Sequence, residues 1–327
     1  MQQTIKSLQE ALKNYEPREA KSIIDLLLEE ICQLSRVDRI MHPDFILPDD
    51  QRQRLTDCAK LLSQGVPVQQ TLGYEWFCSQ RFKITPDVLI PRPETAELVQ
   101  WICEDVKALD DVSELGDEEP ENGGVSILDM GTGTGCIAIS LARLINNSQV
   151  LAIDLSTAAL TVANENSCQQ GVDNVYFAQC DILKSVDNDY FNTQINRELT
   201  SYQPIYNKYN PQELFKGYQQ ENRVFNIIVS NPPYICQQEK KEMSRIVLDH
   251  EPSMALFVPD NDPLLFYRTI AEFGLSHLSD QGRLYFEINA AYGAETCEML
   301  RKMGYKNVIL RQDINGRDRM VRASINE

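Results

Sequence analysis

The chain has 327 residues, of which 43% are hydrophobic, and it carries a formal net charge of −17. This length suits two domains, or one domain with additions, and no apolar run reaches the ~18 residues that span a membrane. An acidic chain repels phosphate backbones, and the sequence has no block of Lys and Arg, so a nucleic acid is an unfavoured partner.

The cysteine and histidine content points to the compartment. The nine cysteines are scattered singly, none of them in a CxxC pair, and there are three histidines. This pattern indicates reduced thiols and argues against a disulfide framework and against a metal site. Because the first residues also lack the basic and apolar regions of a secretory leader, we expect a cytoplasmic protein with neither a metal nor a membrane anchor.

Residues 1–72 predict a small helical bundle. Two helices are expected, within 17–36 and 48–65, the second ending at Gly65. Their apolar faces are predicted to comprise Ile23, Ile24, Leu27, Leu28, Ile31 and Leu34 in the first helix, and Leu55, Cys58, Leu61 and Leu62 in the second. Over 73–91, aromatic and β-branched residues alternate with polar ones, which predicts a β-hairpin that links the bundle to a second domain, 92–327.

Strand and helix patterns alternate through the second domain. Short apolar runs at 125–130, 149–155, 174–183 and 225–230 predict strands, and periodic segments between or after them predict helices. Such alternation is typical of an α/β fold with a mostly parallel, doubly wound sheet. An acidic stretch, 104–124, predicts a helix end followed by a solvated loop. The polar, tyrosine-rich stretch 184–224 is long for a crossover, and it is either a lid or substrate-contact element or an added decoration.

A glycine loop, "GTGTG" at 131–135, follows the first of these strands and precedes a helix. In a doubly wound sheet this turn faces the ligand crevice, where glycine lets the backbone approach a ligand and the helix N-terminus favours an anionic group. Asp154, at the end of the second strand, can hold ribose hydroxyls, and Asp181, at the end of the third, can accept from an adenine amino group. The loop reads GxGxG, with Cys136 in the sixth position, whereas dinucleotides usually require GxGxxG. It therefore favours S-adenosylmethionine, which carries a carboxylate and no phosphate.

The fourth strand ends in Asn231, Pro232, Pro233 and Tyr234 at the same edge of the predicted sheet. The prolines make the turn rigid, so its backbone carbonyls and the Asn231 amide oxygen become pre-aimed acceptors. Two acceptors suit a planar –NH2 group, because they orient its nitrogen toward an electrophilic methyl group and stabilise the positive charge that develops there. Tyr234 offers a ring face for packing. The motif predicts methyl transfer to a planar nitrogen.

Together these motifs resemble those of class I S-adenosylmethionine-dependent methyltransferases that modify planar nitrogens in DNA adenine, rRNA guanine or protein glutamine. Further segments narrow the resemblance to the HemK/PrmC family: "LIPRPETAELV" (Leu89–Val99), "HEPSMALF" (His250–Phe257) with "LLFYRTI", and "GRDRMVRA" near the C-terminus. That family methylates the glutamine of the GGQ motif in class I peptide chain release factors, the proteins of translation termination. The "PRPET" form is more similar to the release-factor enzyme than to its ribosomal-protein relative.

The resemblance implies a role for each motif residue. The loop residues Gly131, Thr132, Gly133, Thr134 and Gly135 would hold the methionine part of the cofactor, Asp154 its ribose, and Asp181 and Ile182 its adenine. Asn231, Pro232, Pro233 and Tyr234 would hold the substrate glutamine, with Asn231, Pro232 and Tyr234 as the catalytic group. Pro91, Arg92, Pro93 and Glu94 would line or brace the mouth of the site, and the helical bundle would dock the release factor.

Three departures accompany the resemblance. Gln70 and Thr71 give "QQTLG" where the family usually reads QYILG, Ile182 replaces a frequent aromatic residue, and the segments 104–124 and 184–224 are extra. Three alternatives stay open: a nucleic-acid methyltransferase acting on the exocyclic amino group of adenine or guanine, a ribosomal-protein glutamine methyltransferase, and a binding module without activity. The charge argues against the first, and the intact motifs argue against the last.

Overall fold

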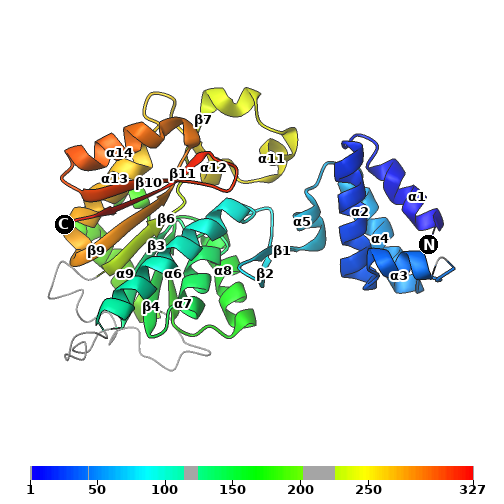
Figure 1. The fold of residues 1–327 in the computed structure, drawn as a ribbon, viewed down its shortest axis with the longest axis horizontal. Coiled ribbons are helices and arrows are strands. Elements are labelled where there is room, and N and C mark those ends of the chain that lie inside the picture. The colour runs from blue at the N-terminus through cyan, green and yellow to red at the C-terminus, as the bar shows by residue number, and fades with distance from the viewer. Residues whose placement is uncertain (1, 43, 114–123, 202–224, 327) are drawn as a thin grey trace. The chain divides into compact units, whose positions relative to one another are not determined.

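The computed structural model describes residues 2–42, 44–113, 124–201 and 225–326. The chain forms two compact units (Figure 1). The N-terminal unit comprises Met1–Glu75 and Ser244–His250, and the second unit comprises Trp76–Met243 and Glu251–Glu327. No helix in the described ranges is long and apolar enough to cross a membrane.

The N-terminal unit is helical. Its helices are α1 (Gln2–Ala11), α2 (Pro17–Cys32), α3 (Arg36–Met41), α4 (Asp49–Ser63), α5 (Val68–Leu72) and α11 (Arg245–His250). The predicted apolar face of α2 is buried, and the helix ends at Cys32 because Gln33 adopts a positive φ of 55°. In α4 the assignment of Leu61 to the core was wrong: its side chain is 38% exposed, and Ala59 turns inward with Leu62 instead.

Gln70, one of the departures from the family pattern, has a structural partner within this unit. Its Nε2 donates a hydrogen bond to the carbonyl oxygen of His250 at 2.8 Å. The contact ties α5 to the end of α11, which lies 180 residues further along the chain. The amide at this position therefore helps to assemble the helical unit.

The predicted hairpin is present and is shorter than expected. Strands β1 (Tyr74–Phe77) and β2 (Gln80–Lys83) form a two-stranded sheet. Its turn residues Cys78 and Ser79 have φ values of 47° and 63°, the positive values that a two-residue type I′ turn requires at both positions. From Ile84 to Ile90 the chain packs its apolar residues on α8 (Thr157–Gln170), against Ala159 and Val162.

A seven-stranded sheet is the centre of the second unit. Its strands lie in the order β10 (Lys306–Gln312), β11 (Asp318–Ser324), β9 (Leu278–Glu287), β6 (Phe225–Ser230), β3 (Val125–Met130), β4 (Ser148–Asp154) and β5 (Val175–Gln179). The five strands from β9 to β5 are parallel, and β11 runs antiparallel to both β9 and β10. The mostly parallel α/β fold is thus confirmed, and strand β11 was missed. The strand order reverses between β3 and β6, where the ligand crevice of such a fold is expected.

Helices cover both faces of this sheet (Figure 1). On one face, α6 (Pro93–Ser113), α7 (Cys136–Leu144) and α8 pack against Ile127, Val150 and Val229. On the other face, α9 (Asn188–Ser201), α13 (Leu265–His277) and α14 (Gly293–Lys302) pack against Leu128, Leu151 and Ile228. The short elements η1 (Ile182–Lys184), β7 (Ile235–Cys236), η3 (Gln237–Lys241), α12 (Ser253–Leu256), β8 (Phe257–Val258) and η4 (Ala290–Tyr292) complete the unit.

Helix α9 corrects the interpretation of 184–224 as one added segment. Phe191 and Ile195, four residues apart, are buried in the sheet core, so 188–201 is the crossover helix between β5 and β6. The sequence pattern did not predict this helix, because Phe191 and Ile195 are the two residues of its buried face and their neighbours are polar. The remainder of that stretch, 202–224, and residues 114–123 of the acidic loop lie outside the described residues.

Candidate active site

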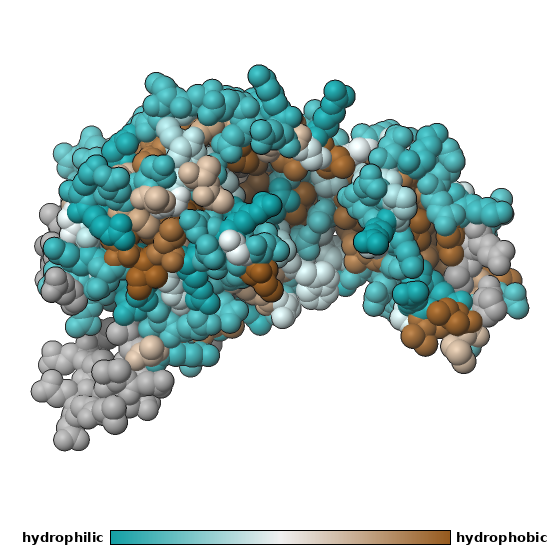
Figure 2. All heavy atoms as spheres, turned by 45° about the horizontal axis from the view of Figure 1, so that its top comes forward, coloured by the Kyte–Doolittle hydropathy of each residue, from teal (hydrophilic) through white to brown (hydrophobic). Residues whose placement is uncertain are grey.

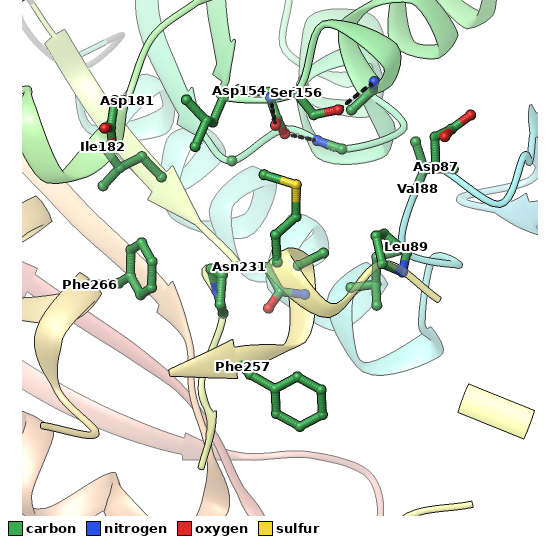
Figure 3. Close-up of a pocket in the computed structure, with 18 residues that line it drawn as sticks. Asp87, Val88, Leu89, Asp154, Ser156, Asp181, Ile182, Asn231, Phe257 and Phe266 are labelled. Atoms are coloured by element: carbon green, nitrogen blue, oxygen red, sulfur yellow. Dashed lines mark hydrogen bonds between the residues drawn. The ribbon is translucent and has the colours of Figure 1, made fainter. Parts of the chain in front are cut away.

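A cavity of about 320 Å³ lies in the second unit, where β3, β4 and β6 end (Figure 3). This volume falls in the range of small-molecule sites, about 300–1,000 Å³. Its lining comprises Asp87, Val88, Leu89, Gly131, Gly133, Asp154, Leu155, Ser156, Ala159, Asp181, Ile182, Asn231, Pro233, Pro252, Met254, Ala255, Phe257 and Phe266. The cavity therefore brings together residues from the glycine loop, both strand-end acids and the Asn-Pro-Pro-Tyr turn.

The glycine loop needs glycine for two different reasons. Gly131 and Gly133 line the cavity with φ values of 82° and 55°, and a Cβ built on Gly133 would meet nothing within 4 Å. A Cβ on Gly135 would instead come within 2.9 Å of the Ile139 side chain and 3.1 Å of the Ala163 Cβ. Gly133 thus leaves room for a ligand, and Gly135 allows α7 and α8 to approach each other.

The threonines of the loop, Thr132 and Thr134, do not line the cavity. Thr132 donates from its Oγ1 to Asp129 Oδ2 at 2.7 Å, and the Thr134 carbonyl accepts from Asn166 Nδ2 at 2.9 Å. Asp129 is fully buried, which raises the pKa of its carboxyl to about 7. The Thr132 side chain and the Thr134 backbone therefore fix the loop to residues outside the cavity lining.

Asp154 binds the glycine loop directly. Its Oδ2 accepts from the Gly133 N–H and its Oδ1 from the Ser156 N–H, each at 2.9 Å (Figure 3). Burial raises the pKa of Asp154 above its ordinary value, although the two backbone hydrogen bonds oppose that rise. Each carboxylate oxygen has a further lone pair, so this side chain can also accept from a ligand hydroxyl.

Asp181 and Ile182 form another part of the wall. Asp181 Oδ1 accepts from the Leu183 N–H at 3.0 Å and so caps η1, while Oδ2 lies 3.5 Å from Lys184 Nζ. Ile182 is buried and presents an apolar side chain to the cavity.

Asn231 is the polar residue of the turn that lines the cavity. Its Nδ2 donates to Thr95 Oγ1 at 3.2 Å, and none of the described residues donates to its Oδ1. Pro233 also lines the cavity, whereas Pro232 and Tyr234 do not. The carbonyl of Tyr234 accepts from Asn289 Nδ2 at 3.1 Å, so this carbonyl is already engaged.

Arg92 braces the site from outside. Its guanidinium lies 2.5 Å from Glu251 Oε1, and Glu251, buried, also accepts from the Ile90 N–H at 3.2 Å. This contact fastens residues 87–92 to Pro252, which lines the cavity, and to the start of α12, which follows Pro252 directly. Neither Arg92 nor Glu94 lines the cavity. Of the two predicted roles for Arg92, lining the mouth of the site or bracing it, its geometry fits bracing.

Several residues of the site were missed by the sequence analysis. The 87–89 strip, Met254, Phe257 and Phe266 line the cavity, and Thr95 and Glu287 lie behind Asn231. Glu287 could have been found, because it is a carboxylate at the end of a central strand, as Asp154 is. Leu89, Met254, Phe257 and Phe266 lie within the segments that carry the family resemblance, but nothing in their apolar side chains indicated a place in the cavity wall. Among the described residues, no group of three or more His, Cys, Asp or Glu is placed to hold a metal ion.

Comparisons with known proteins identify the family of this chain. Residues 121–260 match a family model described as a methyltransferase domain, and residues 2–73 match one described as the PrmC N-terminal domain. A release factor glutamine methyltransferase of Flavobacterium psychrophilum is 39% identical over 310 residues, which cover 95% of this chain and 93% of the relative. Its counterpart in Bacteroides thetaiotaomicron is 37% identical over 310 residues, 95% of this chain and 94% of the relative.

Solved structures share the fold. The hMettl16 catalytic domain, solved in complex with an RNA hairpin, superimposes with a TM-score of 0.50 at 15% identity, over 85% of this chain and 83% of that one. At this identity the likeness concerns the fold alone.

Proposed function

The chain belongs to the family of release factor glutamine methyltransferases, and from this premise we propose which substrate it uses and which of its residues act in the transfer. Its substrate is the glutamine of the GGQ motif in a class I release factor, and the side-chain amide nitrogen receives the methyl group. The donor is S-adenosylmethionine, which supplies an electrophilic methyl group when bound.

The residues around the cavity fit this donor. Gly133 leaves open space beside the backbone, Asp154 retains acceptor capacity for ribose hydroxyls, and Asp181 lies at the end of the neighbouring strand. Ile182 and Phe266 supply apolar surface for a planar base. We assign the glycine loop to the methionine part, Asp154 to the ribose, and Asp181 with Ile182 to the adenine.

The observation that carries the proposal is the engagement of Asn231. Because its NH2 group is held by Thr95, its Oδ1 is the atom left to accept from a substrate –NH2 group. An amide nitrogen is a weak nucleophile, and an acceptor on its hydrogens both orients it and stabilises positive charge that develops on it. Pro232 and Pro233 keep Asn231 in place. Tyr234 donates its hydroxyl to Glu287 and does not line the cavity, so we assign it to support of the turn from behind.

The N-terminal unit is assigned to docking of the release factor. Apolar side chains of α3 and the residues after it are exposed, namely Val37, Ile40, Met41 and Ile46, the last by 82%. Figure 2 shows apolar residues gathered at the surface of this unit. A single glutamine on a loop makes a small contact, so recognition of a whole protein needs a second surface.

The docking surface is tested by Ile40→Ser combined with Met41→Ser. We expect a KM for intact release factor raised by about tenfold or more, with kcat unchanged and no change toward a short GGQ peptide. Leu144→Ser, at an exposed leucine of the second unit, is the matched control. Equal effects on protein and peptide would count against docking.

Substrate class is tested by incubating the protein with labelled donor and, in parallel, with a class I release factor or with total nucleic acid. Label in the release factor alone is the expected result. Label in nucleic acid, with none in the release factor, would replace this proposal by an amino methyltransferase of nucleic acids.

A further inference from the structure

Behind the cavity, four side chains form one hydrogen-bonded chain. Asn231 Nδ2 donates to Thr95 Oγ1 at 3.2 Å, Thr95 Oγ1 donates to Glu287 Oε2 at 2.5 Å, and Tyr234 donates its hydroxyl to Glu287 Oε1 at 3.2 Å. Thr95 and Glu287 are buried, and neither lines the cavity. Burial raises the pKa of Glu287 above its ordinary value, and the hydrogen bonds from Thr95 and Tyr234 and the positive charge of Arg319 oppose that rise. In the proposed transfer Thr95 serves only to hold the Asn231 NH2 group, and Glu287 serves only to accept from Tyr234.

The direction of these hydrogen bonds is set by chemistry. Both oxygens of Glu287 accept hydroxyl hydrogens, one from Thr95 and one from Tyr234, so Thr95 gives its single hydroxyl hydrogen to this carboxylate. The Thr95 oxygen then has only lone pairs to offer to Asn231, and a side-chain amide can meet lone pairs only with its NH2 group. Glu287 therefore decides, through Thr95, which end of the Asn231 amide faces the cavity.

We propose that Thr95 and Glu287 are positioning residues that lock the Asn231 amide with its oxygen toward the substrate, and so make the site selective for a side-chain amide over a carboxylate. The inference rests on the proposed function. With Oδ1 facing the cavity, a glutamine –NH2 finds an acceptor, whereas a glutamate oxygen meets another oxygen and loses its hydrogen bond. If the Asn231 amide were free to rotate by 180° about its terminal bond, it could form a hydrogen bond with either a glutamine –NH2 or a glutamate oxygen.

The same chain makes Asn231 a better acceptor. Successive hydrogen bonds in a buried chain polarise one another, and this chain starts from a carboxylate. Tyr234 donates to the other carboxylate oxygen of Glu287, and that hydrogen bond holds the tyrosine ring in one orientation. The four residues thus behave as one unit in which the outermost group, Asn231, is the one that reaches the substrate.

The test compares Thr95→Val, which keeps the shape and removes the hydroxyl, with Thr95→Ser, which keeps the hydroxyl. Two quantities are measured for each: kcat on a class I release factor, and the ratio of binding affinities for that release factor and for its variant with glutamate in place of the GGQ glutamine. For Thr95→Val we expect kcat lower by about 10- to 100-fold and an affinity ratio that falls from about tenfold or more to near one. For Thr95→Ser both stay within about threefold of the wild-type values, and cofactor affinity is unchanged in both variants.

Glu287→Gln provides a second route if Thr95→Val does not fold. A glutamine amide can donate to Thr95, which frees the threonine hydrogen for Asn231 and favours the reversed amide. We expect this variant to lose the preference for the glutamine-bearing release factor. The inference is overturned if folded, cofactor-binding Thr95→Val and Glu287→Gln keep the wild-type kcat and affinity ratio, or if wild-type protein methylates the release factor yet binds both forms equally. A wild-type protein that transfers no methyl group to the release factor would instead refute the proposed function.

Discussion

Asn166 holds the hairpin and the glycine loop together, and its replacement by alanine tests how much the site depends on this contact. The side chain is fully buried in α8. Its Oδ1 accepts from the Lys83 N–H at 2.6 Å, and its Nδ2 donates to the Thr134 carbonyl at 2.9 Å and to the Lys83 carbonyl at 3.3 Å. One amide thus satisfies backbone groups of β2 and of the glycine loop.

Asn166→Ala removes these three hydrogen bonds and leaves the Thr134 carbonyl and the Lys83 N–H without their partner. Each buried group left unpaired costs about 1–3 kcal/mol, so we expect the free energy of unfolding to fall by about 3 kcal/mol. In a unit of this size that corresponds to a melting temperature lower by roughly 6–12 °C. Because Thr134 belongs to the loop assigned to the cofactor, affinity for S-adenosylmethionine should fall as well.

Urea denaturation of the full chain measures the first effect, and calorimetric titration with S-adenosylmethionine measures the second. Asn164→Ala is the matched control, because Asn164 is exposed on the same helix and should change stability by less than about 0.5 kcal/mol. If the Asn166→Ala protein is as stable as the Asn164→Ala protein, at an unchanged denaturant slope, the three hydrogen bonds of Asn166 do not stabilise the fold.

Three further predictions concern charged groups. Burial raises the pKa of Asp129 to about 7, so its contribution to stability is full below pH ~4 and is lost by up to about 4 kcal/mol as the pH rises through ~7. Asp129→Asn should flatten that part of a plot of urea midpoint against pH, and an unchanged slope would contradict the assignment. Arg92→Ala leaves the buried Glu251 carboxylate without its ion-pair partner and should lower the free energy of unfolding by about 3 kcal/mol in urea denaturation. Adding Glu251→Gln should reduce that loss, and equal stabilities of the single and double variants would argue against the ion pair. Asp154→Ala removes the acceptor of two backbone N–H groups and should weaken S-adenosylmethionine binding by more than about tenfold in calorimetry, and wild-type affinity would exclude Asp154 from the site.

Much of the fold and part of the site could be predicted because the signals are local. The glycine loop and the Asn-Pro-Pro-Tyr turn are each a few consecutive residues at the end of an apolar strand, and the topology of a doubly wound sheet brings such ends to one edge. Gly131, Gly133, Asp154, Asp181, Ile182, Asn231 and Pro233 meet at the cavity for that reason. Their roles in binding and transfer stay predictions.

The rest depends on contacts that no local pattern records. Thr95 and Glu287 are 192 residues apart, and only the completed sheet places one hydroxyl against one carboxylate. Strand β11 was missed because its charged residues interrupt the apolar ones, of which Met320, Val321 and Ala323 are buried. Leu61 has the spacing of a core residue, yet the helix turns it outward because Ala59 and Leu62 already fill the interface.

In the proposed transfer, Asn231 holds a glutamine amide of a release factor while its nitrogen receives the methyl group. The most direct measurement is mass spectrometry of the tryptic peptide that contains the GGQ motif, after incubation of release factor and S-adenosylmethionine with wild-type protein or with Asn231→Ala. We expect one added methyl group on the glutamine with wild-type protein, and none with Asn231→Ala although calorimetry shows that this variant still binds the cofactor. A glutamine methylated by Asn231→Ala at the wild-type rate would show that Asn231 does not hold the substrate amide.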